Sequence, residues 1–503
     1  MKPMLSHDQF RPLVEQFNRD DNEDIINTIP NAQSWDWIAA NAPLFDCPDP
    51  AIVEIYYYRW WTYRKHIKQT PAGKIVTEFI SDVRHAGSHN SISCAAGFHL
   101  AEGRWLREQA FLDEYTRFWF RMNNGKPEPK FHNYSSWFPR AMLDRSFATG
   151  ETAILIDLLD DLIADYAAWE AEKSLPSGLF WQYDVRDAME ESISGGRKHK
   201  NFRPTINSYM FANAQAIAQI ASLAGRMEIA ERFNIKASTL RALVHDKMWD
   251  ESSQFFKAQT EEGPLCDARE AIGFIPWQFN LPQAGCERAW EQLADPHGFW
   301  APFGITTAER RHALFRSHGV GKCEWDGAVW PFATSQTLYA LANLLRNYSP
   351  PLSTPLGADW RRVYFDALYT YAKSHRKNGI PYLGEYLCEM TGEWLKGDNP
   401  RSRYYNHSTF NDLIITGLIG LVPQPDDTLV LHPLLPADTW EWFALENVPY
   451  RGRSVSIMWD RFGKRFNRGE GLRVYVDGTE AAASPKLSQL TVRIGSPPRT
   501  SRT

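Results

Sequence analysis

The chain has 503 residues, of which 43% are hydrophobic and 14% aromatic, and its formal net charge at pH 7 is -5. This length supports a large buried core and, at about 150 residues per domain, favours two or three domains. Scattered Lys and Arg residues and a slightly acidic balance exclude the basic surface that a nucleic acid partner needs. The sequence shows neither a run of about 18 apolar residues, as a membrane-spanning helix needs, nor the apolar segment of a signal peptide at its N-terminus. We therefore expect a soluble, cytoplasmic protein without a membrane partner.

Helical periodicity dominates from about residue 50 to residue 421. Apolar residues recur three and four positions apart, as in helices that bury one face. Loops rich in Pro, Gly and Asn separate these blocks, and because the helices come in pairs we predict stacked helical hairpins. The predicted helices cover residues 52–67, 103–122, 152–171, 208–224, 228–248, 328–345, 360–372 and 409–421.

The pattern changes from Thr428 onward. Short runs of β-branched and aromatic residues alternate with Pro, Asp and Gly, which is typical of strands. The predicted strands cover residues 429–432, 443–445, 454–459 and 472–476. The composition therefore predicts a small β module after a helical body.

Two short acidic segments lie far apart in the chain, at residues 184–192 and 384–393, and each is flanked by Trp and Tyr residues. Two carboxyl groups that meet from distant segments can protonate a glycosidic oxygen and activate a water opposite it. Aromatic faces suit the C–H faces of sugar rings. The sequence therefore predicts a glycoside hydrolase that acts on a small carbohydrate.

Each acidic segment offers one preferred catalytic residue. Glu190 is the candidate general acid, because a loop acid beside aromatic residues is partly desolvated and its pKa rises toward neutrality. Asp187 is the reserve acid or a supporting group. Glu385 is the candidate general base, whereas Glu389 and Glu393 lie in a turn-like stretch that we expect to be exposed. A solvated acidic loop is the alternative interpretation of the first segment.

Further residues are candidates for sugar binding. Trp325 and Trp330 flank Asp326, whose carboxylate can accept two sugar hydroxyls. Arg203 directly follows the acidic loop. For the other candidates, core packing or helix capping is the alternative interpretation; they are Arg59, Trp60, His89, Trp137, Asn207, Tyr209 and His407.

The residues around both acids resemble a known family. Met189-Glu190-Glu191, and Glu385 ahead of Thr391-Gly392-Glu393, look like the acid and base segments of the six-hairpin glycosidases, which include glucoamylases, trehalases and glycoside hydrolase family 63. Residues 324–332, EWDGAVWPF, resemble the stretch with which family 63 relatives line the glycone subsite. The resemblance covers about residues 50 to 475 and is closest to the mannosylglycerate-hydrolase-like branch. Family 63 enzymes usually have Asp at the acid position, where this chain has Glu190.

This resemblance implies an all-α fold with an (α/α)6 toroid of six helical hairpins. Residues 1–425 would form the catalytic domain with an N-terminal helical extension, 426–480 a small β-strand module packed on the toroid, and 481–503 a tail. It also implies an exo-acting, inverting hydrolase of the α-glucoside or α-mannoside type. The two carboxyl groups would then stand about 6.5–9.5 Å apart, against about 5–5.5 Å in a retaining enzyme.

Other functions remain open at this point. An L-arabinofuranosidase is possible on the same fold. A sugar phosphorylase, which would hold phosphate with cationic residues, and a sugar epimerase, which would use a pair of His residues, are also possible. A non-catalytic carbohydrate-binding protein is the third alternative. The chain has no nucleotide-binding glycine motif, no HExxH and no zinc-like Cys spacing, so we expect neither a cofactor nor a metal. The sequence leaves the oligomeric state open.

Overall fold

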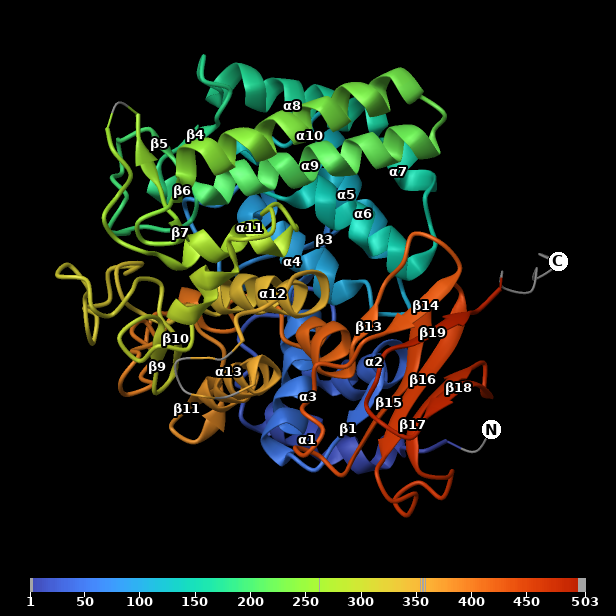
Figure 1. Cartoon of the computed structure of the whole chain (residues 1–503). Helices are drawn as coiled ribbons and strands as arrows, with labels where there is room; N and C mark the ends of the chain where they lie inside the picture. Colours follow the sequence, from blue (N-terminus) through green and yellow to red (C-terminus); the bar gives the residue numbers. More distant parts are fainter. Residues whose placement is uncertain (1–2, 262, 353, 355–356, 358, 496–503) are drawn as a thin grey trace.

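Figure 1 shows the computed structural model of the chain, which describes residues 3–495 except 262, 353, 355–356 and 358. Helices make up most of the regular structure up to residue 419. They are α1 (His7–Arg19), α2 (Ser34–Asn41), α3 (Pro50–Lys65), α4 (Ser93–Gly103), α5 (Ala110–Arg121), α6 (Phe138–Thr149), α7 (Ala153–Asp157), α8 (Leu159–Lys173), α9 (Pro204–Leu223), α10 (Met227–Met248), α11 (Ile275–Gln278), α12 (Pro331–Asn347), α13 (Trp360–Ser374) and the π-helix Leu413–Ile419.

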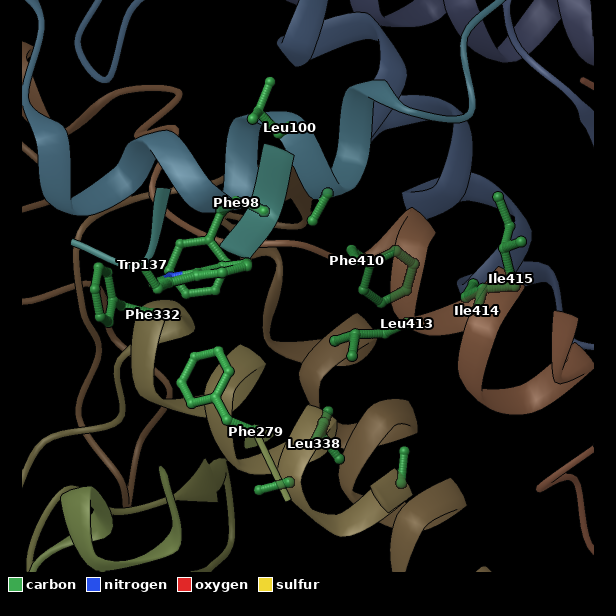
Figure 2. Close-up of a cluster of buried hydrophobic side chains, with 14 of the residues drawn as sticks. Phe98, Leu100, Trp137, Phe279, Phe332, Leu338, Phe410, Leu413, Ile414 and Ile415 are labelled. Atoms are coloured by element: carbon green, nitrogen blue, oxygen red, sulfur yellow. The ribbon is translucent and has the colours of Figure 1, made fainter. Parts of the chain in front are cut away.

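Within the described residues, six of these helices surround the central core. α4 contacts α6, α6 contacts α9, α9 contacts α11, α11 contacts α12, and α12 contacts the π-helix. Glu102 near the end of α4 links the last member to the first, because its carboxylate accepts the backbone N–H groups of residues 410–412 at 2.9–3.3 Å. Figure 2 shows the apolar side chains between these helices, with Phe98, Trp137, Phe279 and Phe332 close together.

A second set of helices covers the first. α8 and α10 pack along α9, and α13 packs against α12 and α3. α3 is buried on almost every side, because α1, α2 and α13 all contact it. The helices therefore form an inner and an outer set.

The structure corrects the bounds of several predicted helices. The segment predicted at 152–171 is broken at Leu158 into α7 and α8, and the segment at 103–122 contains a loop before α5. α9 begins at Pro204 rather than at Ser208. Proline is well tolerated at the first position of a helix, because the backbone N–H that it lacks would have no hydrogen-bond partner there. The helix expected at 409–421 is the shorter π-helix.

The strands predicted after Thr428 form at the expected places. A five-stranded antiparallel sheet has the order β1-β15-β16-β17-β18, and β14 pairs with β13 (Leu421–Val422) and β19. Figure 1 shows these strands together on one side of the helices. The larger strands are β1 (Leu44–Asp46), β14 (Thr428–Leu431), β15 (Trp442–Tyr450), β16 (Arg453–Asp460), β17 (Gly471–Val476), β18 (Thr479–Ser484) and β19 (Leu490–Arg493).

Both ends of the chain contribute to this side of the molecule. β1 comes from the N-terminal region and pairs with β15, and Glu446 in β15 accepts the backbone N–H groups of Met4 and Leu5. The segment predicted as a tail holds β19 and most of β18, whereas residues 496–503 lie outside the described residues.

Short strand pairs stiffen the loops between helices. They consist of β2 (Ile67–Thr70) with β3 (Gly73–Val76), β4 (Trp181–Gln182) with β5 (Asn201–Phe202) and β8 (Gln259–Thr260), β6 (Trp249–Asp250) with β7 (Phe255–Phe256), β9 (Trp300–Ala301) with β10 (Gly304–Ile305), and β11 (Arg376–Lys377) with β12 (Ile380–Pro381), while β13 (Leu421–Val422) joins β14. None of the described helices combines the length and apolar character that crossing a membrane requires.

Candidate active site

Three loops meet where the sequence places the candidate acid and base. The loop before α12 lies between the other two, because the backbone N–H of Trp325 donates to the carbonyl oxygen of Glu190 at 3.1 Å. On its other side, the N–H of Cys323 donates to the hydroxyl of Tyr386 at 2.8 Å, next to Glu385. Each loop leads toward an inner helix, so the fold gathers the two acidic segments at one end of the helical ring.

The electrostatics of Glu190 suit a proton donor. Burial raises the pKa of its carboxyl group, and the negative charge of Glu385 acts in the same direction. Its own backbone N–H and Lys396 oppose these effects, and the resulting pKa is about 7. A group with this pKa holds its proton for a substantial fraction of the time at neutral pH. The two carboxyl groups are therefore close enough for their charges to interact.

Glu385 lies in a different environment. Its side chain is 4% exposed, and its carboxylate is 3.4 Å from both the Lys396 ammonium and the Arg401 guanidinium. The hydroxyl of Ser402 donates to it at 3.4 Å, and the Cys323 thiol lies 3.6 Å away. Buried carboxylates need such charged and polar partners, so the contacts fit an acceptor of protons rather than a donor.

Aromatic rings form a wall beside the two acids. Tyr386 stacks on Trp330 with ring centroids 4.5 Å apart and planes at 10°, and Trp330 stacks on Trp325 at 4.7 Å and 28°. Asp326 pairs with Arg316 at 2.9 Å through one oxygen, while its other oxygen has no protein partner among the described residues. The rings are thus packed on one another, and the second oxygen of Asp326 is left as an acceptor of the kind that binds a sugar hydroxyl.

Asp187, the reserve acid, is held away from such a role. It forms a fully buried ion pair with Arg203, in which Nε lies 2.7 Å from Oδ2, and it accepts a hydrogen bond from Ser135. Arg203 also donates to the hydroxyl of Ser194 at 3.2 Å. These contacts tie the acidic loop to the start of α9, which positions Glu190.

Breaking this ion pair is expected to destabilise the protein. Asp187→Asn leaves Arg203 buried without its counter-charge, and we expect the free energy of unfolding to fall by about 3–5 kcal/mol. Chemical denaturation measures this loss, whereas kcat/KM of the folded fraction should change by less than about tenfold because Glu190 keeps its proton. A loss of kcat/KM much larger than tenfold in the folded variant would contradict a purely structural role for this ion pair.

Several other predicted contacts lie in protein packing. Arg59 donates to Tyr371 and Ser408 at 3.2 Å, and Trp60 is fully buried. The Asn207 side chain binds the backbone of Phe180 at 2.8 and 2.9 Å. The structure therefore does not bring these three side chains to the carboxyl pair.

The remaining predicted residues divide between the site and its surroundings. His407 reaches the site, since its Nε2 lies 3.2 Å from the backbone oxygen of Glu385, and burial lowers its pKa to about 3. Tyr209 is buried on α9 and its hydroxyl accepts from Gln336. Trp137 lines a cavity of about 240 Å³ whose lining includes neither carboxyl group, and His89 lies on a short 3-10 turn near Phe118.

The sequence analysis missed four residues of the site: Glu78, Cys323, Lys396 and Arg401. Glu78 stands alone between Thr77 and Phe79 in a loop after β3, so no local acidic pattern marks it. Lys396 and Arg401 follow the base segment closely, which was a usable signal. Glu389 was predicted exposed but is fully buried, because its carboxylate accepts from Ser317 at 2.6 Å and from the N–H of His318.

In the part of the chain that the structure describes, no group of three or more His, Cys, Asp or Glu side chains is arranged to hold a metal ion. The six cysteines are free.

Comparison with known families agrees with this geometry. The profile of the mannosylglycerate hydrolase MGH1-like glycoside hydrolase domain matches residues 88–408. The chain belongs to this family. The match includes both Glu190 and Glu385, and a second profile, the glycosyl hydrolase family 65 C-terminal domain, matches residues 424–482. The resemblance inferred from the acidic segments is confirmed.

Solved structures extend the comparison for this MGH1-like protein. A structure named sialidase is 48% identical, with a TM-score of 0.94, over 97% of this chain and 45% of its own. The chain thus spans less than half the length of that protein. The mannosylglycerate hydrolase of family GH63 from Thermus thermophilus in complex with glucose has 10% identity and a TM-score of 0.51, covering 72% of this chain and 98% of its own.

A third solved structure also shares the fold. The GH78 family rhamnosidase of a Bacillus species has 12% identity and a TM-score of 0.60, covering 86% of this chain and 41% of its own. At these identities the two enzymes show a common fold and nothing about substrate. The MGH1-like chain therefore has the helical fold of these glycosidases.

Proposed function

We propose that this protein is an exo-acting, inverting glycoside hydrolase that cleaves a small glycoside or the non-reducing end of an oligosaccharide. The observation that carries the proposal is the contrast between its two central carboxyl groups. Glu190 has a pKa of about 7 and can hold a proton, whereas Glu385 is paired with two cations. Two carboxyl groups with different environments and one shared site are the requirement for acid and base roles in glycoside hydrolysis.

In the proposed reaction, Glu190 donates its proton to the glycosidic oxygen as the bond to the anomeric carbon breaks. Glu385 accepts a proton from a water molecule, whose oxygen attacks the anomeric carbon from the opposite face. The product sugar has the inverted configuration, and the aglycone leaves as an alcohol. The carboxyl separation of about 6.5–9.5 Å stays a prediction of this mechanism.

Near-complete burial supports exo action. Glu385, Trp325 and Trp330 are each at most 4% exposed, so a substrate that reaches them must enter below the protein surface rather than lie along an open groove. A closed pocket accepts one chain end, whereas internal cleavage needs a groove that is open on both sides.

The domain division stays part of this proposal. The ring contacts support a six-hairpin (α/α)6 toroid within residues 1–425, although the outer partner ahead of α12 is only a short 3-10 turn at Glu287–Gln292. The family 65 profile at residues 424–482 supports a separate β module at 426–480. Because β19 pairs with β14, we assign residues 481–493 to this module rather than to a tail.

A substrate screen tests the proposed function. Aryl α-glucosides and α-mannosides are the first choices, and both anomers of aryl L-arabinofuranosides test the alternative on the same fold. NMR of the first product formed should show the inverted anomer, since inverting enzymes release it directly. Cleavage that depends on added phosphate would identify a phosphorylase, and a product of retained configuration would contradict the mechanism.

The pH dependence follows from the pKa of Glu190. The acid must be protonated in the free enzyme, so kcat/KM should be constant below pH 7 on this limb and fall about tenfold per unit above it. Initial rates between pH 5 and 9 at substrate concentrations far below KM give this profile. An alkaline limb that persists unchanged in Glu190→Gln would assign it to another group.

A further inference from the structure

A third carboxyl group, that of Glu78, lies beside the proposed acid and base. Its backbone is fixed, because its carbonyl oxygen accepts the N–H of Asn406 at 2.9 Å and the preceding carbonyl of Thr77 accepts the Asn406 side chain at 3.1 Å. The Glu78 side chain is 3% exposed. Asn406 directly precedes His407, whose Nε2 lies 3.2 Å from the backbone oxygen of Glu385, so Glu78 lies beside the base segment. The charges of Glu385 and Glu190 both act on the Glu78 carboxyl group.

The partners of Glu78 differ from those of other buried acids in this protein. Asp187 pairs with Arg203, Asp412 pairs with Arg104 at 2.7 Å, and Glu102 accepts three backbone N–H groups. Among the described residues, the Glu78 carboxyl group has neither an ion pair nor a backbone donor. Its contacts are the neutral groups of Tyr405 and Cys94, whose Sγ lies 3.8 Å away.

These surroundings keep Glu78 neutral. Burial raises its pKa to about 8, and the charges of Glu385 and Glu190 contribute, against the opposing hydrogen bond from Tyr405. A protonated carboxyl group is a hydrogen-bond donor, which an ionised one cannot be. Tyr405 and Cys94 both carry donor hydrogens, so the acid O–H of Glu78 is free to bind an acceptor that enters the site.

We propose that Glu78 is a further substrate-binding residue, and that its carboxyl group donates a hydrogen bond to a hydroxyl of the sugar ring held between Glu190 and Glu385. This inference rests on the proposed function. It explains why a carboxyl group is kept in a buried place where ionisation is costly, because a neutral acid there offers a directed donor within reach of the reacting ring.

Two substitutions at Glu78 test whether the side chain acts as a neutral hydrogen-bond donor or through its negative charge. Glu78→Gln keeps an N–H donor of similar shape, so kcat/KM should stay within about tenfold of wild type, whereas Glu78→Ala should lose about 100-fold or more. Monodeoxy substrates locate the contact: for the analogue that lacks the bound hydroxyl, Glu78→Ala and wild type should react at nearly equal rates. Glu309→Gln is the control, since Glu309 is a buried glutamate paired with Arg269 outside the site.

A stability measurement tests the protonation without any substrate. The pKa of Glu78 is about 8 in the folded state, against an ordinary value of 4.5. The contribution of Glu78 to the stability of wild type is therefore fully present below pH 4.5 and is lost as the pH rises to 8. Gln cannot ionise. The difference in Tm, Glu78→Gln minus wild type, should therefore increase between pH 5 and pH 9.

The outcomes distinguish the two proposals. Full activity of Glu78→Ala, or equal losses in Glu78→Gln and Glu78→Ala, would overturn the role of Glu78 while leaving the hydrolase assignment in place. A Tm difference that is the same at pH 5 and pH 9 would overturn its protonation. Hydrolysis that survives in Glu190→Gln and Glu385→Gln would overturn the proposed function itself.

Discussion

Glu190→Gln should lower kcat/KM by about 10²–10⁴-fold for a substrate with an alkyl aglycone. The amide has nearly the same shape as the carboxyl group but cannot give up a proton to the glycosidic oxygen. The loss should shrink to within about tenfold for a dinitrophenyl glycoside, because that leaving group departs as an anion without protonation. Steady-state rates on the two substrates measure the difference.

The neighbouring Glu191 provides a matched control. Its carboxylate pairs with Arg197 at 3.0 Å on a partly exposed loop, and Glu191→Gln should leave both rates nearly unchanged. The alkaline limb of the pH profile should disappear in Glu190→Gln and persist in Glu191→Gln. Equal losses on both leaving groups would mean that Glu190 is not the acid.

The sequence predicted most of the fold because most of its elements carry local signals. The strands after Thr428 and the long helices α3, α10 and α13 follow from periodicity and from Pro and Gly boundaries. The division at Leu158 and the π-helix could not be predicted, since both depend on how neighbouring helices pack. The pairing of β1 with β15 joins segments that lie far apart in the sequence, and no local sequence pattern predicts it.

The candidate site was predictable where its residues cluster in sequence. Glu190 and Glu385 stand in acidic segments beside aromatic residues, and the stacked Trp325 and Trp330 share one motif. Glu78 stands alone in the sequence, and only the folded chain brings it to the other two carboxyl groups. Asn207 was predicted to bind sugar, but its side chain hydrogen-bonds the backbone of Phe180. The sequence alone does not distinguish such a buried structural contact from a contact with substrate.

Glu385→Gln should remove at least about 10³-fold of kcat/KM with every leaving group, because water activation is needed however the aglycone departs. KM should change little. This uniform loss is the opposite of the pattern expected for Glu190→Gln, so the two variants measured on the same pair of substrates assign base and acid independently. Glu393→Gln is the control, since Glu393 belongs to the same segment and is exposed.

Azide should restore turnover in Glu385→Gln. The substitution leaves the positive charges of Lys396 and Arg401 without the carboxylate that they now contact, so a small anion is attracted to the place where water is activated. Azide needs no base: its nitrogen bonds to the anomeric carbon as the glycosidic bond breaks and Glu190 protonates the leaving oxygen. The product should be a glycosyl azide of inverted configuration. A glycosyl azide of retained configuration, or rescue in Glu190→Gln instead, would show that Glu385 does not activate water from the face opposite the acid.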